Sequence, residues 1–208
     1  TLEIGVVAKV EVGKNYFTND FNRIKAGSRN PELAIHYSVG IDDALGADFA
    51  FHKFKVNLRH RWATKFGFTK YQIRTGLLLG DAPYPLFFMH QGNNNFYYSS
   101  SAYSNMGEFE YASDRYAAFW LDHHFDGTIL NTIPLIKHLK LRSIFLFKML
   151  VGDISPANKD LILMPASMGS TFQEKEKIYA EMGFGIENIL KVLRVEFVWR
   201  LTQRKTQF

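Results

Sequence analysis

Residues 53–62 read KFKVNLRHRW, and this stretch decides the fold because apolar and polar side chains alternate along it. Successive side chains of a β-strand point to opposite faces of its sheet. One face collects the apolar side chains, namely Phe54, Val56, Leu58 and Trp62. The other face collects the polar side chains, namely Lys53, Lys55, Asn57, Arg59 and Arg61. The stretch therefore predicts a strand with one apolar and one basic face.

The same alternation recurs along most of the chain and predicts about eight strands with almost no helix. The strands are expected near residues 3–12, 32–41, 53–62, 70–79, 113–125, 142–151, 177–186 and 193–201. Tight reversals are expected at 42–46, 65–67 and 187–190, and a short helical or wedge-like piece at 129–139. Several strands are longer than the roughly 5 to 6 residues usual in soluble sheets and match the 9 to 11 that cross a bilayer.

Composition excludes several other classes of protein. The 208 residues contain no cysteine, 22% are charged and the net charge is +5, which excludes a disulfide scaffold and a highly charged disordered tail. No apolar run reaches the roughly 18 residues of a transmembrane helix, and the mean hydropathy is −0.14. The amino end carries no leader pattern, so the chain is expected to be a mature protein or a piece of a longer one.

Alternation alone leaves a soluble barrel or sandwich and a membrane barrel open, because each has one apolar face. A basic side chain facing hydrocarbon costs about 2 to 4 kcal/mol near the midplane, so in a membrane the basic face must point inward. Long connections at 81–111 and 153–174 are typical of outer loops. An aromatic girdle is expected at Trp62, Tyr71, Trp120 and Trp199. These features favour an antiparallel transmembrane β-barrel in a single domain over residues 1–208.

An edge strand in lipid leaves backbone groups unpaired, so the sheet must close alone or be completed by further strands. The inside of the barrel would be lined by a basic set: Lys53, Lys55, Arg59, Arg61, Lys70, Arg74, Arg142, Arg194 and Arg200. This surplus of positive charge suits a wider barrel, of which the chain would be the carboxy-terminal half.

Five short motifs, taken in order, resemble the carboxy-terminal barrel of an uncharacterised outer-membrane family. They are residues 82–87 (APYPLF), 90–93 (HQGN), 113–117 (SDRYA), 123–127 (HHFDG) and 131–137 (NTIPLIK). In that family a carboxypeptidase-regulatory-like domain precedes the barrel. The resemblance implies the outer membrane of a Gram-negative bacterium and no established enzymatic activity. That front domain is absent from this sequence, and Phe208 is out of phase with the last strand, so the chain is expected to stop short of the natural terminus.

No catalytic, metal or cofactor site is predicted. His123 and His124 are adjacent on an expected strand and point to opposite faces, which argues against a shared metal ion. No Walker, dinucleotide or zinc-protease motif is present. Ser113 and Asp114, together with His123, leave an outer-membrane lipid hydrolase as one alternative. A soluble ligand-binding barrel or sandwich is the other.

Six of these basic residues form a stripe, namely Lys53, Lys55, Arg59, Arg61, Lys70 and Arg74. The stripe has three interpretations: an anion or lipid-headgroup site, a phosphate-backbone reader, or an ordinary charged lining paired with acidic neighbours. The third is favoured, and the partners expected are outer-membrane lipid, other outer-membrane proteins and an unidentified small solute, with no nucleic acid.

Residues with an expected role in the connections are Pro83, Tyr84, Pro85, Gly92, Asn93, Asp114 and Arg115. Asp114 and Arg115 are expected to pair with each other. The aromatic residues Phe96, Tyr97, Tyr98 and Tyr103 are expected either to form an external binding surface or to fold inward and cap the barrel.

Overall fold

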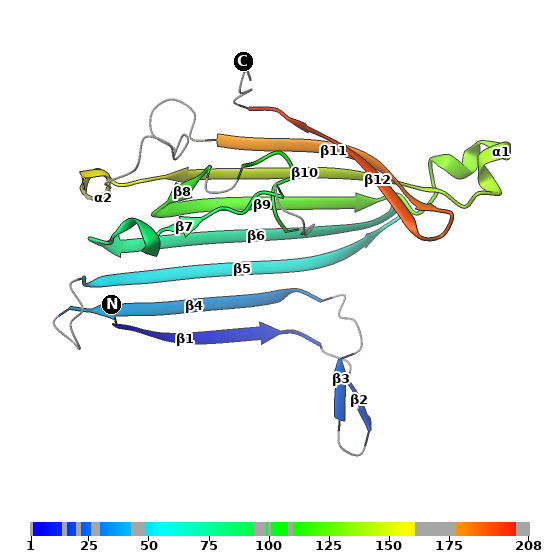
Figure 1. The fold of residues 1–208 in the computed structure, drawn as a ribbon. Helices are drawn as coiled ribbons and strands as arrows, with labels where there is room; N and C mark the ends of the chain where they lie inside the picture. The colour runs from blue at the N-terminus through cyan, green and yellow to red at the C-terminus, as the bar shows by residue number, and fades with distance from the viewer. Residues whose placement is uncertain are drawn as a thin grey trace.

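A computed structural model describes residues 2–13, 16–19, 22–25, 30–42, 49–93, 99, 101–107, 110–160 and 178–202. Its main feature is one antiparallel sheet of eight strands in the order β1-β4-β5-β6-β9-β10-β11-β12 (Figure 1). The strands are β1 (Leu2–Glu11), β4 (Glu32–Ile41), β5 (Phe51–Thr64), β6 (Gly67–Gly80), β9 (Arg115–His124), β10 (Arg142–Asp153), β11 (Ile178–Ile189) and β12 (Leu193–Arg200). The predicted all-β antiparallel architecture is confirmed.

Smaller elements flank the sheet. β2 (Tyr16–Asn19) pairs with β3 (Asn22–Lys25), and β7 (Phe88–Met89) pairs with β8 (Ala112–Ser113). The helices are short: η1 (Tyr84–Leu86), η2 (Leu130–Thr132), α1 (Pro134–Lys137) and α2 (Pro156–Asp160). Among the described residues, no helix has the length and apolar character needed to span a bilayer. η2 and α1 confirm the short helical piece expected at 129–139.

The longest hairpin shows how local sequence sets the register. β5 and β6 pair over fourteen residues, from Phe51 opposite Gly80 to Thr64 opposite Gly67. Gly67 has φ +118°, and a Cβ there would lie 1.9 Å from the carbonyl oxygen of His124. Only glycine fits a position with this backbone conformation and this close approach. The reversal predicted at 65–67 is therefore confirmed.

The two faces of the sheet differ in what covers them. The face that carries Trp120, Lys148 and Glu181, which we call the covered face, packs against residues that follow β6. The opposite face, which we call the open face, carries apolar side chains that remain exposed, from 37% for Ile73 to 66% for Val6. These open-face residues are Ile4, Val6, Val10, Ile35, Ile41, Phe54, Trp62, Ile73, Leu77, Leu79, Ile178, Phe184, Ile186, Leu193, Val195, Phe197 and Trp199.

The connections lie at the two ends of the sheet. Because neighbouring strands are antiparallel, the segments 42–50, 81–114 and 154–177 join strands at one end, and 12–31, 65–66, 125–141 and 190–192 join them at the other. Both connections predicted to be long therefore leave from the same end, although residues 161–174 lie outside the described residues. The turn predicted at 42–46 shares that end, and its residues 43–46 are also outside the described part.

Two local predictions need correction. The last reversal lies at 190–192 rather than 187–190, because a register shift between Glu187 and Ile189 lets β11 continue to Ile189. Trp120 does not belong to an exposed girdle: it lies on the covered face and is 7% exposed. Apolar residues flank Trp120 on both sides in the sequence, so alternation did not reveal its face.

The two edges of the sheet are β1 and β12, and within the described residues neither pairs with the other. Each edge strand presents one row of backbone groups without a partner strand in the sheet.

Candidate functional site on the covered face

The described residues between 81 and 113, which we call the covering segment, pack on the covered face. One apolar cluster joins Tyr103, Met106 and Tyr111 of the segment to four residues of the sheet, namely Ala118, Trp120, Leu150 and Tyr179. A second joins segment residues Ala82, Phe87, Phe88 and Ala112 to Phe51, Leu78 and Ile154. The aromatic side chains of the segment thus supply much of the buried core.

Two charged side chains of the sheet hold the backbone of this segment. Glu181 on β11 accepts hydrogen bonds from the backbone N–H of Ser104 at 2.8 Å and of Asn105 at 2.5 Å. Lys148, directly across the β10–β11 pair from Glu181, donates to the carbonyl oxygen of Ala102 at 2.6 Å. Both side chains are buried, so each depends on its hydrogen bonds to the segment and on the opposite charge across the strand pair.

Arg200 on β12 forms a third anchor. Its guanidinium donates to Glu110 Oε1 and to the Tyr111 hydroxyl, each at 2.9 Å. The Arg200 guanidinium also lies 4.6 Å from the centre of the Tyr179 ring. One strand residue therefore joins a carboxylate, a hydroxyl and an aromatic face.

A fourth anchor lies where the covering segment meets β9. Asp114 Oδ2 accepts from the backbone N–H of Ser155 at 2.6 Å and from Asn158 Nδ2 at 3.0 Å. Asn158 Oδ1 in turn accepts from the backbone N–H of Ala82 at 3.2 Å. This chain of contacts ties the start and the end of the covering segment to α2.

The predicted Asp114–Arg115 pair is wrong. Arg115 instead pairs with Asp153 across the β9–β10 ladder at 3.0 Å. Neighbouring side chains at a strand start point in opposite directions, so Asp114 reaches α2 while Arg115 reaches the adjacent strand.

The other motif residues of the connection have positions within the covering segment. Pro83 precedes η1, and Tyr84 and Pro85 lie in it; the next carbonyl, of Leu86, accepts from Lys53 Nζ at 2.7 Å. Asn93 exchanges two hydrogen bonds with the backbone of Ser99, both at 2.9 Å.

Gly92 pairs with Tyr103, and a Cβ on Gly92 would lie 1.9 Å from the Met106 carbonyl oxygen. Tyr103 is 1% exposed, so of the two alternatives for the aromatic loop residues it takes the inward one. Phe96, Tyr97 and Tyr98 lie outside the described residues.

Ser113 and His90 form a buried pair within the covering segment. His90 Nε2 lies 2.7 Å from Ser113 Oγ, and Ser113 is fully buried. Burial lowers the pKa of His90 to about 3, so its imidazole is neutral at physiological pH. His123, the histidine considered with Ser113 in the hydrolase alternative, bonds Thr69 at 2.8 Å on the open face. The structure therefore does not bring Ser113, Asp114 and His123 together.

Burial also changes the pKa of Tyr103 in the covering segment. It raises this pKa far above its ordinary value, so the hydroxyl stays protonated. Its phenol is then available as a donor, and it donates to the Met149 carbonyl oxygen at 3.3 Å.

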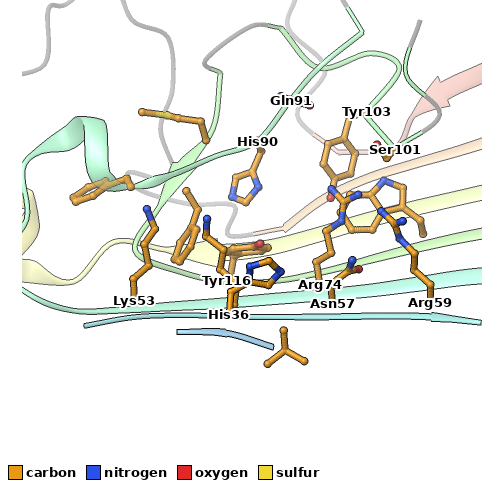
Figure 2. A pocket seen from close by; sticks show the side chains of 16 residues that line it. His36, Lys53, Asn57, Arg59, Arg74, His90, Gln91, Ser101, Tyr103 and Tyr116 are labelled. Carbon is orange, nitrogen blue, oxygen red and sulfur yellow. The ribbon is translucent and has the colours of Figure 1, made fainter. Parts of the chain in front are cut away.

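A pocket of about 430 Å³ remains between the sheet and the covering segment (Figure 2). Its floor comes from β4, β5, β6 and β9, and its roof from residues that include His90, Gln91 and Tyr103. Figure 2 shows Lys53, Arg59 and Arg74 rising from the sheet toward this roof.

The nine basic residues of the predicted lining fall into three groups. Lys53, Lys55, Arg59 and Arg74 line the pocket. Arg61 and Lys70 lie over the Phe68 ring, at 3.8 and 5.4 Å from its centre. Three have carboxylate partners: Arg142 with Asp126 at 3.7 Å, Arg194 with Glu196, and Arg200 with Glu110.

Within the described ranges, no group of three or more histidine, aspartate or glutamate side chains is placed to hold a metal ion.

Several anchors were not found from the sequence, chiefly Glu110 and Asn158. Their partners are far away in the chain: Glu110 lies 90 residues from Arg200, and Asn158 lies 76 from Ala82. A charged residue at a strand position that faces an aromatic cluster, as Glu181 does, is the signal that could have suggested such anchoring.

The chain matches a known family over most of its length. Residues 1–161 match the model of the C-terminal domain of a family of unknown function, DUF5686. No curated protein and no solved structure matches the chain.

Proposed function

We propose that this chain, which belongs to the DUF5686 C-terminal domain family, forms a transmembrane β-barrel, or part of one, in the outer membrane of a Gram-negative bacterium. Its role in this proposal is structural, transport or assembly, with no catalysis of its own. Its partners would be outer-membrane lipid and other outer-membrane proteins.

The observation that carries the proposal is the open face. Seventeen strand positions there hold large apolar side chains that are at least 37% exposed. Monomeric soluble proteins rarely expose a continuous apolar surface of this extent. The basic side chains of the strands lie on the other face, and Lys53, Lys55, Arg59 and Arg74 lie beneath the covering segment. Acyl chains would solvate such an open face without cost to the charged residues.

Polar side chains on the open face support the same assignment because they satisfy one another across strands. Tyr37 bonds His52 at 2.9 Å, and His60 bonds Tyr71 at 3.1 Å. In hydrocarbon an unpaired polar group costs several kcal/mol, whereas a bonded pair costs much less. Such pairing is unnecessary on a surface that water covers.

Closure is the second part of the proposal. In lipid the backbone groups of β1 and β12 need partners, because open sheet edges are not stable there. We propose that these edges pair with each other or with further strands of the native protein.

Two adjacent valines of β1 provide a matched test. Val6 on the open face and Val7 on the covered face are 66% and 60% exposed, so a lysine at either site would be nearly neutral in water. In a bilayer, Val6→Lys should lower the free energy of unfolding by about 2 to 4 kcal/mol, and Val7→Lys should not.

The measurement is urea unfolding of the native protein refolded into phosphatidylcholine vesicles. Its gel mobility with and without heating reports whether the barrel has formed. Equal effects of Val6→Lys and Val7→Lys, or a monodisperse protein in buffer without detergent, would contradict the proposal.

A further inference from the structure

The pocket beneath the covering segment is lined by positive charge alone. Its sixteen lining residues include two lysines, two arginines and two histidines, but no aspartate or glutamate. The cationic residues are Lys53, Lys55, Arg59 and Arg74. Like charges gathered in a partly buried space repel one another unless a counter-charge enters it.

The hydrogen bonds and ring contacts of these four residues do not supply that counter-charge, and the Glu3 carboxylate acts on Lys53 only at longer range. Lys53 donates to a backbone carbonyl, of Leu86 at 2.7 Å, and Lys55 lies 5.8 Å from the centre of the Phe88 ring. In the described part of the chain, no carboxylate forms an ion pair with any of the four. This separates them from Arg142, Arg194 and Arg200, each of which has one.

A neutral amide lies between the two arginines. The Gln72 side-chain oxygen, in the orientation that satisfies both guanidinium groups, accepts from Arg59 Nε at 2.9 Å and from Arg74 Nε at 2.7 Å. The nearest carboxylate in the register, Glu32 opposite Arg59, bonds Lys9 at 2.8 Å. Both guanidinium groups are thus oriented by Gln72 and retain N–H groups that no carboxylate of the described residues occupies.

An unpaired donor points to the same ligand chemistry. Trp120 lines the pocket and is 7% exposed, yet its indole N–H is buried with no hydrogen-bond partner within the described residues. A buried N–H without an acceptor is costly, and the indole can only donate. The lysines and arginines that line the pocket likewise only donate, so a ligand rich in acceptor oxygens would satisfy them.

We infer that this pocket binds a phosphoryl group, either as free inorganic phosphate or a small phosphate ester, or as the headgroup of an anionic lipid. A phosphate carries about two negative charges and three or four acceptor oxygens, which match a site made only of cations and donors. Carboxylates with a single charge match it less well. The inference concerns binding and does not depend on where the open face lies.

The experiment is isothermal titration of the native protein in a neutral detergent, in low-salt buffer, with inorganic phosphate, glycerol 3-phosphate, dihexanoyl phosphatidic acid and acetate. We expect the phosphate compounds to bind at least about tenfold more tightly than acetate, and their binding to weaken as salt rises. If phosphatidic acid binds much more tightly than glycerol 3-phosphate, the source is lipid; if their affinities are equal, the source is a soluble phosphate.

Variants locate the binding. Arg74→Gln and, separately, Lys55→Gln should each reduce phosphate affinity about tenfold, whereas Arg142→Gln, which removes a charge already paired with Asp126, should leave it unchanged. Heat-dependent gel mobility checks that each variant folds. Absence of phosphate binding, affinity for acetate equal to that for phosphate, or equal effects of all three variants would overturn the inference. None of these outcomes affects the unfolding measurement with Val6→Lys. Failure of the phosphate site can therefore be told apart from failure of the membrane-barrel proposal.

Discussion

Arg200 on β12 and Glu110 of the covering segment form an ion pair 90 residues apart in sequence, with 2.9 Å between Arg200 Nη2 and Glu110 Oε1. Their side chains are 13% and 4% exposed, so water screens the pair little. The last strand of the sheet, β12, thereby holds the segment that follows β6.

Arg200→Met should loosen the covering segment, because Glu110 would stay buried without this partner. Breaking a buried pair costs about 3 kcal/mol or more. Hydrogen exchange at residues 101–107 and 110–113 should become faster, with little change in β5 and β6. The matched control is Arg115→Met: Arg115 is 52% exposed in its pair with Asp153, and its loss should cost under about 1 kcal/mol. Equal exchange in the two variants would argue against the anchor.

Glu181→Gln tests the second anchor. The glutamate accepts from two backbone N–H groups and from the Tyr179 hydroxyl, and a neutral amide offers one oxygen in place of two. We expect a loss of about 2 to 3 kcal/mol in the free energy of unfolding, measured in urea. A loss under about 0.5 kcal/mol would show that water replaces the lost contacts.

Gly92→Ala should prevent the segment from packing as described. The added Cβ would lie 1.9 Å from the Met106 carbonyl oxygen, which is backbone and cannot move as a side chain can. Overpacking of this kind costs about 1 to 3 kcal/mol. Protease digestion of the folded protein should then cut near residue 92 faster than in the wild type. Gly107→Ala is the control, because its nearest contact would be 3.4 Å away; equal digestion of both would refute the packing.

His90 makes stability depend on pH. Burial lowers the pKa of His90 from 6.5 to about 3. Below about pH 6.5 the imidazole therefore binds a proton in the unfolded chain but stays neutral in the folded chain. Stability is therefore complete above pH 6.5 and decreases as pH falls toward 3, by about 2 kcal/mol at pH 5. The difference in free energy of unfolding between wild type and His90→Asn, measured from pH 8 to 5, should change in this window. A difference that stays constant with pH would contradict a buried neutral His90.

The sheet was predictable from the sequence because alternation is a local property that each strand carries by itself. The residues 53–62 alone place Lys53 and Phe54 on opposite faces, as β5 does. The covering segment was not predictable in the same way, since its contacts join Ala82 to Asn158 and Glu110 to Arg200. A periodic pattern of side chains describes neighbours along one strand and does not predict contacts between residues so far apart in sequence.

The pocket was predicted only in part. The sequence identified Lys53, Lys55, Arg59 and Arg74 as members of a basic lining, but that lining also contained Arg142, Arg194 and Arg200. Alternation places Glu196 on the same face as Arg194, but the partners of Arg142 and Arg200 are Asp126 and Glu110, which lie in connections that alternation does not place.

The three tryptophans test the central claim, that lipid contacts the open face, most directly. Trp62 and Trp199 lie on the open face, 63% and 53% exposed, each near the carboxy-terminal end of its strand, and Trp120 lies on the covered face. Three variants, each keeping one tryptophan and replacing the other two with phenylalanine, would be refolded into vesicles of brominated phosphatidylcholine. The account predicts strong quenching of Trp62 and Trp199 fluorescence and little quenching of Trp120. Unquenched Trp62 and Trp199, with the protein folded, would contradict it.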